Sequence, residues 1–302
     1  MPSAIGATPP MRCWPHCKSV VEIAGAAASI DGVRAIARRR KLDETALRLS
    51  INAADLGRAW IARDQSEVVG IAIAHDSEDE RYIGDCYVEA SYRAQGVGSG
   101  LLAAALDDAQ DRARTMLLDS TDPAAARLAY RYGMALRQPI LRFAGSIPRE
   151  EELAKMAAGE YRFGVEPIDP VAHRMALNEL DRQTRGTVRP ADHASFAREA
   201  SGNAFSLNGE IVGYAYVWPD GCVGPSACAS EAYLVQIFAY SLVTLQRVHR
   251  ASWCTALVPG SNRRIARASL RAGLRIQDPF TIASDTQLPG LSAYIGRHQL
   301  LL

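Results

Sequence analysis

The pattern of apolar and polar positions changes period repeatedly in the first half of the chain. Short apolar or alternating runs predict strands at 20–23, 59–63, 67–75, 81–88, 115–119 and 135–143. Apolar residues at helical spacing predict helices at 30–40, 42–54 and 97–114, and a fourth helix from Pro123 to Gly133. The predicted order of elements in this half is therefore β-α-α-β-β-β-α-β-α-β.

The same order of elements recurs in the second half, which indicates an internal duplication. Strands are predicted at 161–167, 204–207, 210–218, 221–228, 254–258, 274–283 and 291–296, and helices at 170–183, 190–200, 230–249 and 262–272. Asn208-Gly209 is a strong signal for a type I′ hairpin turn. Short segments also agree at corresponding places, since 67–70 (EVVG) matches 210–213 (EIVG) and 131–134 (RYGM) matches 271–274 (RAGL).

The composition changes where the two halves meet. Residues 145–159 contain Pro148, the acidic run Glu150-Glu151-Glu152 and small residues, which is typical of a domain boundary or a connecting helix. With 302 residues, two domains are a reasonable expectation. We therefore expect, in chain order, a disordered leader at 1–18, an N-terminal domain at 19–146, a linker at 147–160 and a C-terminal domain at 161–302.

The charge balance narrows the possible classes of partner. Against 33 Asp and Glu stand 34 Lys and Arg, which gives a net charge of +1, and 48% of residues are hydrophobic. This composition excludes a disordered chain and makes nucleic acid an unexpected partner. Nearly all the basic residues are arginines, and they cluster only at Arg38-Arg39-Arg40-Lys41, which we interpret as the solvated end of a helix.

The absence of certain sequence features gives expectations about the cellular compartment and about metal binding. No apolar run approaches the ~20 residues needed to span a bilayer, and the leader has no signal-peptide pattern. The six cysteines are scattered, so reduced thiols and a cytoplasmic location are expected. Cys13, His16 and Cys17 lie close together, but no second Cys/His pair follows to complete a zinc site, so we expect no metal.

The segment from Val88 to Gly100 carries the clearest chemical signal. It joins a predicted strand to a long helix, and Gly96, Gly98 and Gly100 allow a close approach of backbone to a ligand. The N–H groups and dipole of the following helix would then form a pyrophosphate cradle, to which Arg93 adds a charge-assisted contact. The segment lacks the lysine of a Walker loop and the spacing of a dinucleotide fingerprint. A plain glycine turn between strand and helix remains the alternative.

Arg93-x-x-Gly96-x-Gly98 between a strand and a helix resembles motif A of the GCN5-related N-acetyltransferase (GNAT) superfamily. A later motif is also similar, with Asp122, Ala125, Leu128, Gly133 and Met134 standing where the family tends to have Asn, Ala, Leu, Gly and Phe. The resemblance covers about residues 20–145 and implies acetyl-CoA as co-substrate. It assigns contacts with the cofactor to Tyr87, Val88, Arg93, Ala94, Gln95, Gly96, Val97, Gly98, Ser99, Gly100 and Asp122.

The fold implied is α/β, with two tandem acyl-CoA N-acyltransferase domains, each a mixed, splayed sheet flanked by helices. Such tandem chains are common in actinobacterial genomes. In this family the strand before the loop pairs its backbone with the pantetheine arm. The second half has Gly221-Cys222-Val223-Gly224-Pro225-Ser226 at the corresponding place, without Arg-x-x-Gly-x-Gly, and Pro225 removes a backbone donor. We therefore expect only the first half to bind acyl-CoA.

The catalytic groups are less well marked. The family's usual acid is a Tyr four residues before the late Gly, but that position is Ala129 here and Ser269 in the second half. Tyr130 replaces it if the helix register shifts, or else it is a partly buried packing residue. Candidate bases are Asp85, Glu89 and His75. Cys86 is either a nucleophile or, more simply, a small core residue.

The expected activity is acyl transfer, most simply from acetyl-CoA to the amine of a small molecule by direct attack in a ternary complex. The alternative is a non-catalytic CoA-binding sensor or interaction module. In the second half Tyr214, Tyr216 and Trp218 share one face of a strand, either packed on a helix or lining an acceptor pocket. We expect no nucleic acid or membrane partner, and a monomer or homodimer.

Overall fold

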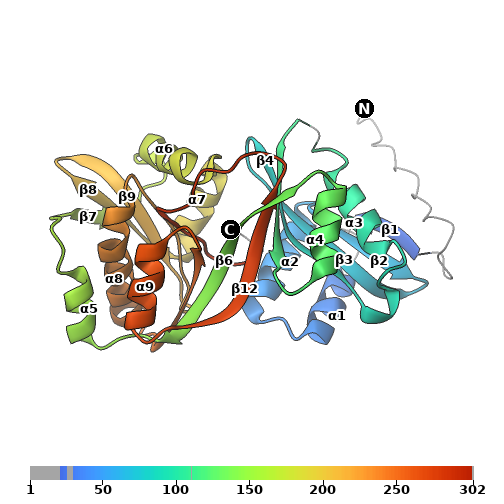
Figure 1. Ribbon diagram of the computed structural model, residues 1–302, viewed down its shortest axis with the longest axis horizontal. Coiled ribbons are helices and arrows are strands. Elements are labelled where there is room, and N and C mark those ends of the chain that lie inside the picture. Colours follow the sequence, from blue (N-terminus) through green and yellow to red (C-terminus); the bar gives the residue numbers. More distant parts are fainter. Residues whose placement is uncertain (1–20, 26–29, 110, 301–302) are drawn as a thin grey trace. The chain divides into compact units, whose positions relative to one another are not determined.

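The computed structural model describes residues 21–25, 30–109 and 111–300 (Figure 1). These residues form two compact units, one of residues up to 75 together with 83–109, the other of 76–82 and 111–300. The expected leader and the cluster of Cys13, His16 and Cys17 lie outside the described residues. The expected domain boundaries stay a prediction.

In the described residues of the first unit, the strands β1, β2, β3 and β4 are neighbours in this order in the sheet, and three helices accompany them. Its elements are β1 (Val21–Gly25), α1 (Ile30–Arg40), α2 (Glu44–Asp55), β2 (Ala59–Asp64), β3 (Glu67–Asp76), β4 (Glu80–Val88), the 3-10 turn Ala90–Tyr92 and α3 (Val97–Leu106). The N-cap of α2 is Asp43, whose Oδ1 accepts from the Ala46 N–H at 2.7 Å. The core is aliphatic and includes Val33, Ile61 and Leu101, each at most 1% exposed.

The helix predicted at 97–114 is wrong in its extent, because α3 ends at Leu106. The alanine-rich sequence gives no clear signal for the end of the helix. The charged residues Asp107 and Asp108 follow directly after that end. The backbone at 113–114 instead begins β5 (Ala113–Asp119): Ala113 N–H donates to Asp79 O at 2.9 Å, and Arg114 N–H donates to Asp285 Oδ1 at 2.8 Å. Tertiary hydrogen bonds here outweigh local helix propensity.

The second unit holds the remaining elements. They are α4 (Pro123–Arg131), β6 (Ala135–Ser146), α5 (Glu150–Ala157), β7 (Gly164–Pro167), α6 (Arg174–Arg185), α7 (Pro190–Glu199), β8 (Ser201–Leu207), β9 (Glu210–Val217), β10 (Val223–Cys228), α8 (Glu231–Val248), β11 (Trp253–Pro259), α9 (Arg263–Arg271), β12 (Arg275–Ser284) and β13 (Tyr294–Ile295). One sheet has the order β13-β10-β9-β8-β7. The predicted hairpin is confirmed, since Asn208 and Gly209 have φ of 52° and 86°, as a type I′ turn requires.

The strands β6 and β12 exchange places between the two halves of the sequence. In the strand order β5-β12-β6-β11, β12 of the second half pairs with β5 of the first, and β6 of the first half pairs with β11 of the second. β6 and β12 also pair with each other and lie side by side in green and red (Figure 1). The mixed α/β fold is confirmed, but this exchange of strands was not predicted from the sequence.

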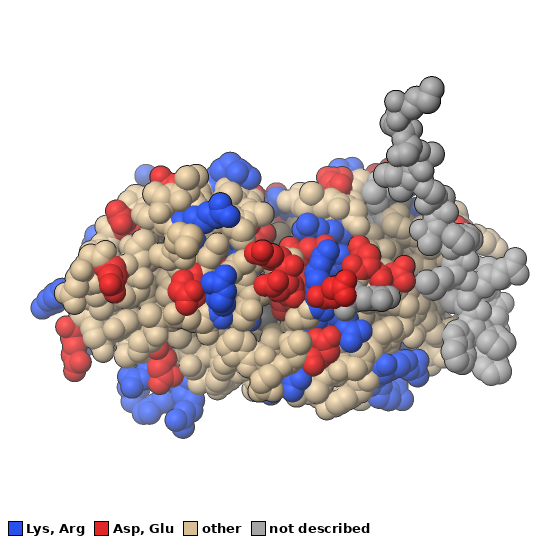
Figure 2. All heavy atoms as spheres, turned by 90° about the horizontal axis from the view of Figure 1, so that it is seen from above, with Lys and Arg blue, Asp and Glu red and all other residues tan. Residues whose placement is uncertain are grey.

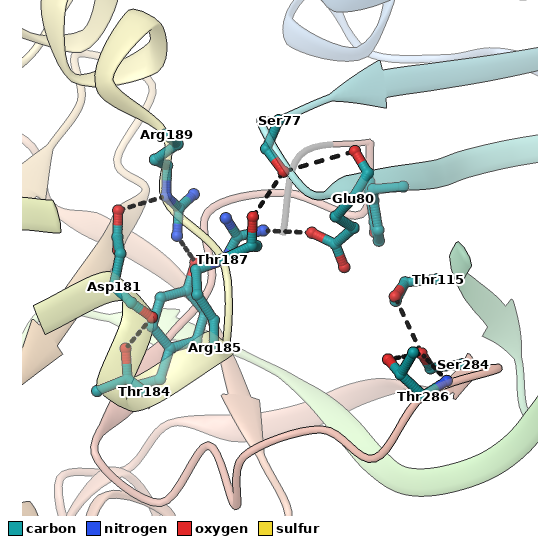
Figure 3. A network of polar contacts seen from close by, with 12 residues as sticks. Ser77, Glu80, Thr115, Asp181, Thr184, Arg185, Thr187, Arg189, Ser284 and Thr286 are labelled. Carbon is teal, nitrogen blue, oxygen red and sulfur yellow. Dashed lines mark hydrogen bonds and ion pairs between the residues drawn. The ribbon is translucent and has the colours of Figure 1, made fainter. Parts of the chain in front are cut away.

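Polar contacts fix the β3–β4 turn within the second unit (Figure 3). Glu80 Oε2 lies 3.2 Å from Arg185 Nη2, and Ser77 Oγ lies 2.7 Å from Thr187 Oγ1. Both members of the ion pair are largely buried, with side chains 7% and 10% exposed. The turn and the start of β4 are therefore anchored to the last residue of α6 and to Thr187, which follows that helix.

Candidate functional site

The loop before α3 leaves the N-terminus of that helix open to an anion. Gly96 is the N-cap with φ 88°, and no side chain of the described residues caps it. The first turn also holds no acidic residue. The first N–H groups of a helix lack partners within the helix. With the helix dipole they form a site suited to a phosphate group.

Arg93 stands at the entrance of this loop. Its Nε donates to Val88 O at 3.0 Å, its side chain is exposed, and Ala94 beside it has φ 60°. Gln95 Nε2 closes the turn by donating to Ser91 O at 2.7 Å. The Arg93 guanidinium is thus held near the end of β4 on an exposed residue, where a phosphate could reach it.

The two faces of β4 have different neighbours. Asp85, Tyr87 and Glu89 contact the last turn of α1, whereas Cys86 Sγ donates to Gly98 O of α3 at 3.8 Å. Arg40 pairs with both oxygens of Asp85 and lies over the Tyr87 ring, 4.2 Å from its centroid. The side chains of Arg40 and Asp85 are only 14% and 12% exposed. The alternation along the strand therefore separates a charged face from a face that packs on α3.

Arg39 makes the second link between α1 and β4. Its Nε donates to Glu89 Oε1 at 2.9 Å, and Glu89 Oε2 accepts from the Tyr87 hydroxyl at 3.0 Å. Burial raises the pKa of Tyr87, and the hydrogen bond to Glu89 raises it further. The interpretation of the arginine cluster as a solvated helix end is thus wrong for Arg40, whereas Arg39 forms ion pairs but stays 38% exposed. The partners of both arginines lie 28 to 50 residues further along the chain, where helical spacing gives no signal.

Cys86 has the environment of a structural thiol. Burial raises its pKa to about 12, the neighbouring Asp85 charge acts in the same direction, and Arg40 opposes both. A nucleophilic cysteine needs the thiolate form near neutral pH. The core alternative for Cys86 is therefore favoured by the structure.

The comparisons with known proteins agree with this geometry. Residues 31–134 match the family model described as Acetyltransferase (GNAT) family, and the match includes α1, β4, the loop and α3. This segment of the chain is therefore similar to a GNAT domain. The matched segment contains the loop from Arg93 to Gly100.

A curated relative and several solved structures support the same assignment. The chain is 32% identical over 125 residues to mycothiol acetyltransferase of Thermobispora bispora, which is 41% of this chain and 40% of that protein. The chain thus spans well under half of the length of this relative.

Among solved structures, a Pyrococcus horikoshii protein provisionally assigned as an acetyltransferase superposes with a TM-score of 0.70 at 15% identity. The superposition covers 93% of this chain and 95% of that one. A tandem GNAT protein from the clavulanic acid biosynthesis pathway gives a TM-score of 0.52 at 17% identity over 77% of this chain and 82% of that one. At these identities the structures show a shared fold.

Two further candidates lie on α4, in the second unit. Asp122 is the N-cap of α4, and its Oδ1 accepts from the Ala124 N–H at 2.8 Å. Ala129, at the family's usual Tyr position, is fully buried, whereas Tyr130 is 59% exposed. Tyr130 is thus not the partly buried packing residue of the sequence analysis. Its role as an acid stays a prediction, as does the cofactor contact of Asp122. His75, the third candidate base, lies in the first unit and is half-buried.

The aromatic residues of β9 form a core rather than a pocket wall. Tyr214, Tyr216 and Trp218 are at most 3% exposed. His193 of α7 bridges Tyr216 and Asp181, with Nδ1 3.1 Å from the Tyr216 hydroxyl and Nε2 2.9 Å from Asp181 Oδ2. Asp181 also pairs with Arg189, as Figure 3 shows. Of the two alternatives for this strand, the packed face is observed.

The surface carries both signs of charge, and the helices are not of membrane type. On the face drawn in Figure 2, Lys and Arg side chains lie intermixed with Asp and Glu. Within the described parts of the chain, none of the helices combines the length and apolar character needed to cross a bilayer.

Proposed function

We propose that this chain is an acyl-CoA-dependent N-acyltransferase that most simply moves the acetyl group of acetyl-CoA to the amine of a small molecule. The observation that carries the proposal is the uncapped N-terminus of α3, preceded by Arg93 and Gly96 within the segment that is similar to a GNAT domain. An open helix N-terminus favours a doubly charged pyrophosphate. Arg93 supplies the positive charge that such a group needs.

In this proposal, different residues of the first unit bind successive parts of acyl-CoA. The pyrophosphate would accept hydrogen bonds from the N–H groups of Val97, Gly98 and Ser99. The pantetheine arm would run along the backbone at Tyr87 and Val88, as in the family that the loop resembles. A backbone N–H of β4 would then stabilise the oxyanion that forms when the amine attacks the thioester carbonyl.

The transfer needs one base and one acid. The amine nitrogen forms a bond to the carbonyl carbon, the carbon–sulfur bond breaks, and the amine loses a proton while the CoA thiolate gains one. Of the two carboxylates on the charged face of β4, Asp85 is held by Arg40 through both oxygens. Glu89 pairs with Arg39 through Oε1 and accepts from the Tyr87 hydroxyl through Oε2, but it is more exposed than Asp85, at 23% against 12%. Glu89, directly or through water, is the better base, and Tyr130 is the candidate acid.

Calorimetric titration with CoA tests the proposal. We expect one binding event in the micromolar range for the wild-type chain and none for Gly98→Trp, whose indole would fill the cradle. Gly209→Ala is the matched control, because no atom lies within 4 Å of a Cβ at the tip of the β8–β9 hairpin. Absence of CoA binding by the folded wild-type protein would overturn the proposal.

The alternative of a non-catalytic CoA sensor is favoured by one observation, the buried Ala129 at the usual Tyr position. A thiol-release assay with acetyl-CoA and a panel of amines separates the two functions. The panel includes amines related to mycothiol, because the curated relative is a mycothiol acetyltransferase. Steady release of CoA with any amine shows catalysis, whereas binding without release across the panel favours the sensor.

A further inference from the structure

The segment 291–299, here called the C-terminal strap, lies between β10 and β11 in the second unit. On one side its β13 pairs with β10 through Ser226↔Ile295 and Ala227↔Tyr294. On the other side Gly296 N–H donates to Leu257 O of β11 at 2.8 Å, and Leu257 N–H returns the bond to Gly296 O at 3.4 Å. The strap thus takes the place of a strand between two strands of the second half.

Side chains fix the strap in this position. Tyr294 and Ile295 are fully buried, and the Tyr294 hydroxyl accepts from the buried Arg189. The Arg297 guanidinium lies 3.5 Å from the centroid of the Trp218 ring. Trp218 and Arg297 are each only 3% exposed, so these contacts desolvate both an aromatic ring and a cation.

Gly224 in β10 is shaped for the strap. A Cβ added at this position would lie 2.4 Å from Gly296 O and 2.8 Å from the Gly296 carbonyl carbon. Both are backbone atoms, so the clash cannot be relieved by a side-chain rotation. Glycine at position 224 therefore lets the strap approach β10 closely, whereas any residue with a Cβ would prevent this approach.

By the duplicated order of elements, β10 is the counterpart of β4, and α8 is the counterpart of α3. In the first half β4 is the strand assigned to the pantetheine arm. In the second half the corresponding strand is already paired with the strap at Ser226, Ala227 and Cys228. A backbone edge that is occupied by protein has no hydrogen-bonding groups left for a second ligand.

The N-termini of α3 and α8 also differ in a way that favours cofactor binding in the first half only. The N-cap of α3 is Gly96, without a side-chain cap and without acidic residues in the first turn. The N-cap of α8 is Ser230, whose Oγ accepts from the Ala232 N–H at 3.3 Å, and Glu231 follows in the first turn. The Glu231 carboxylate repels a pyrophosphate at the N-terminus of α8. It also interacts favourably with the dipole of that helix, in place of a bound anion.

We propose that the C-terminal strap permanently fills the cofactor cleft of the second half. The chain then binds a single CoA, in its first half. This inference rests on the proposed function for the position of the cofactor in the first half. The strap occupies the position of the pantetheine arm. Its backbone amides pair with β10, where the amides of that arm would otherwise bind.

Hydrogen–deuterium exchange of the full chain, with and without saturating CoA, tests the proposal. We expect the amides of 293–297 and of β11 to exchange at least ~100-fold more slowly than an unstructured peptide, with or without CoA. The loop at 93–100 should slow on addition of CoA. Faster exchange of the strap with CoA would overturn the proposal, because CoA would then displace it. If the loop does not respond, the proposed function fails while the result for the strap still stands.

Stoichiometry and one pair of variants sharpen the result. Native mass spectrometry at saturating CoA should show one CoA per chain, and a second bound CoA would contradict the proposal. Gly224→Ala should raise strap exchange at least ~10-fold, because the new Cβ meets backbone atoms of the strap. Gly209→Ala also places alanine at a positive φ but meets nothing within 4 Å, so strap exchange should not change. Equal exchange in both variants would overturn the proposal, and the wild-type measurements decide it if Gly224→Ala does not fold.

Discussion

The guanidinium carbon of Arg40 lies 4.2 Å from the centre of the Tyr87 ring. The same guanidinium pairs with Asp85, two residues earlier on β4. Two positions on one face of the strand are therefore covered by a single side chain from the last turn of α1. Because β4 also leads into the loop at Arg93, the orientation of α1 and the geometry of the candidate cofactor site are linked within the first unit.

The first prediction concerns the stability of this link. Arg40→Met keeps much of the apolar volume but leaves the largely buried carboxylate of Asp85 without its cation. We expect the free energy of unfolding to fall by about 1–3 kcal/mol, measured by urea denaturation. Arg38→Met, an exposed arginine in the same turn, should change it by less than about 0.5 kcal/mol. Equal losses in both variants would show that the Arg40 contacts do not stabilise the fold.

The second prediction separates the two carboxylates of β4. Glu89→Gln should lower kcat by about 10²–10⁴-fold with a smaller change in KM for acetyl-CoA, because the amide cannot accept the amine proton. Asp85→Asn should mainly lower the melting temperature, since Asp85 is held by Arg40 through both oxygens. Steady-state kinetics with the best amine of the panel measures both effects. A larger loss of kcat in Asp85→Asn than in Glu89→Gln would reverse the assignment.

The third prediction uses the raised pKa of Cys86. With a pKa of about 12, the thiolate fraction at pH 8 is about 10⁻⁴. The peptide that contains Cys86 should remain unlabelled by iodoacetamide in the folded protein and become labelled in guanidinium chloride, as read by mass spectrometry. Cys86→Ser should retain kcat within about threefold, because no covalent step passes through the thiol. An acyl group found on Cys86 after incubation with acetyl-CoA would contradict this prediction.

Local signals in the sequence were sufficient for much of the fold. The loop at Arg93–Gly100, the hairpin at Asn208-Gly209 and the order of elements depend on neighbours a few residues apart, and all were predicted. The end of α3, the partners of Arg39 and Arg40, the exchange of β6 and β12 and the strap at 291–299 depend on residues distant in the sequence. Pairing across such distances has no period that a single sequence displays. A strand of two residues such as β13 also gives too short a pattern to reveal its partner.

The fourth prediction concerns the buried network under β9. Desolvation by burial raises the pKa of Asp181, but the Arg189 charge and the hydrogen bond from His193 outweigh it and hold the pKa at about 2. The carboxylate is therefore easier to ionise in the folded state than in the unfolded chain, where the ordinary value is 3.8. Stability from this group is fully present above pH 4 and is lost as the pH falls from about 4 to about 2.

The size of this effect and its control follow from the same shift. The loss between pH 4 and pH 2 should be about 2 kcal/mol of unfolding free energy, measured by urea titrations at several pH values. In Asp181→Asn this part of the pH dependence should disappear, and stability at pH 7 should fall by about 3–5 kcal/mol because Arg189 remains buried without its carboxylate. Asp31→Asn removes a carboxylate that is 97% exposed and controls for the change in net charge. If Asp181→Asn keeps the wild-type slope between pH 4 and pH 2, the acid sensitivity of the fold arises elsewhere.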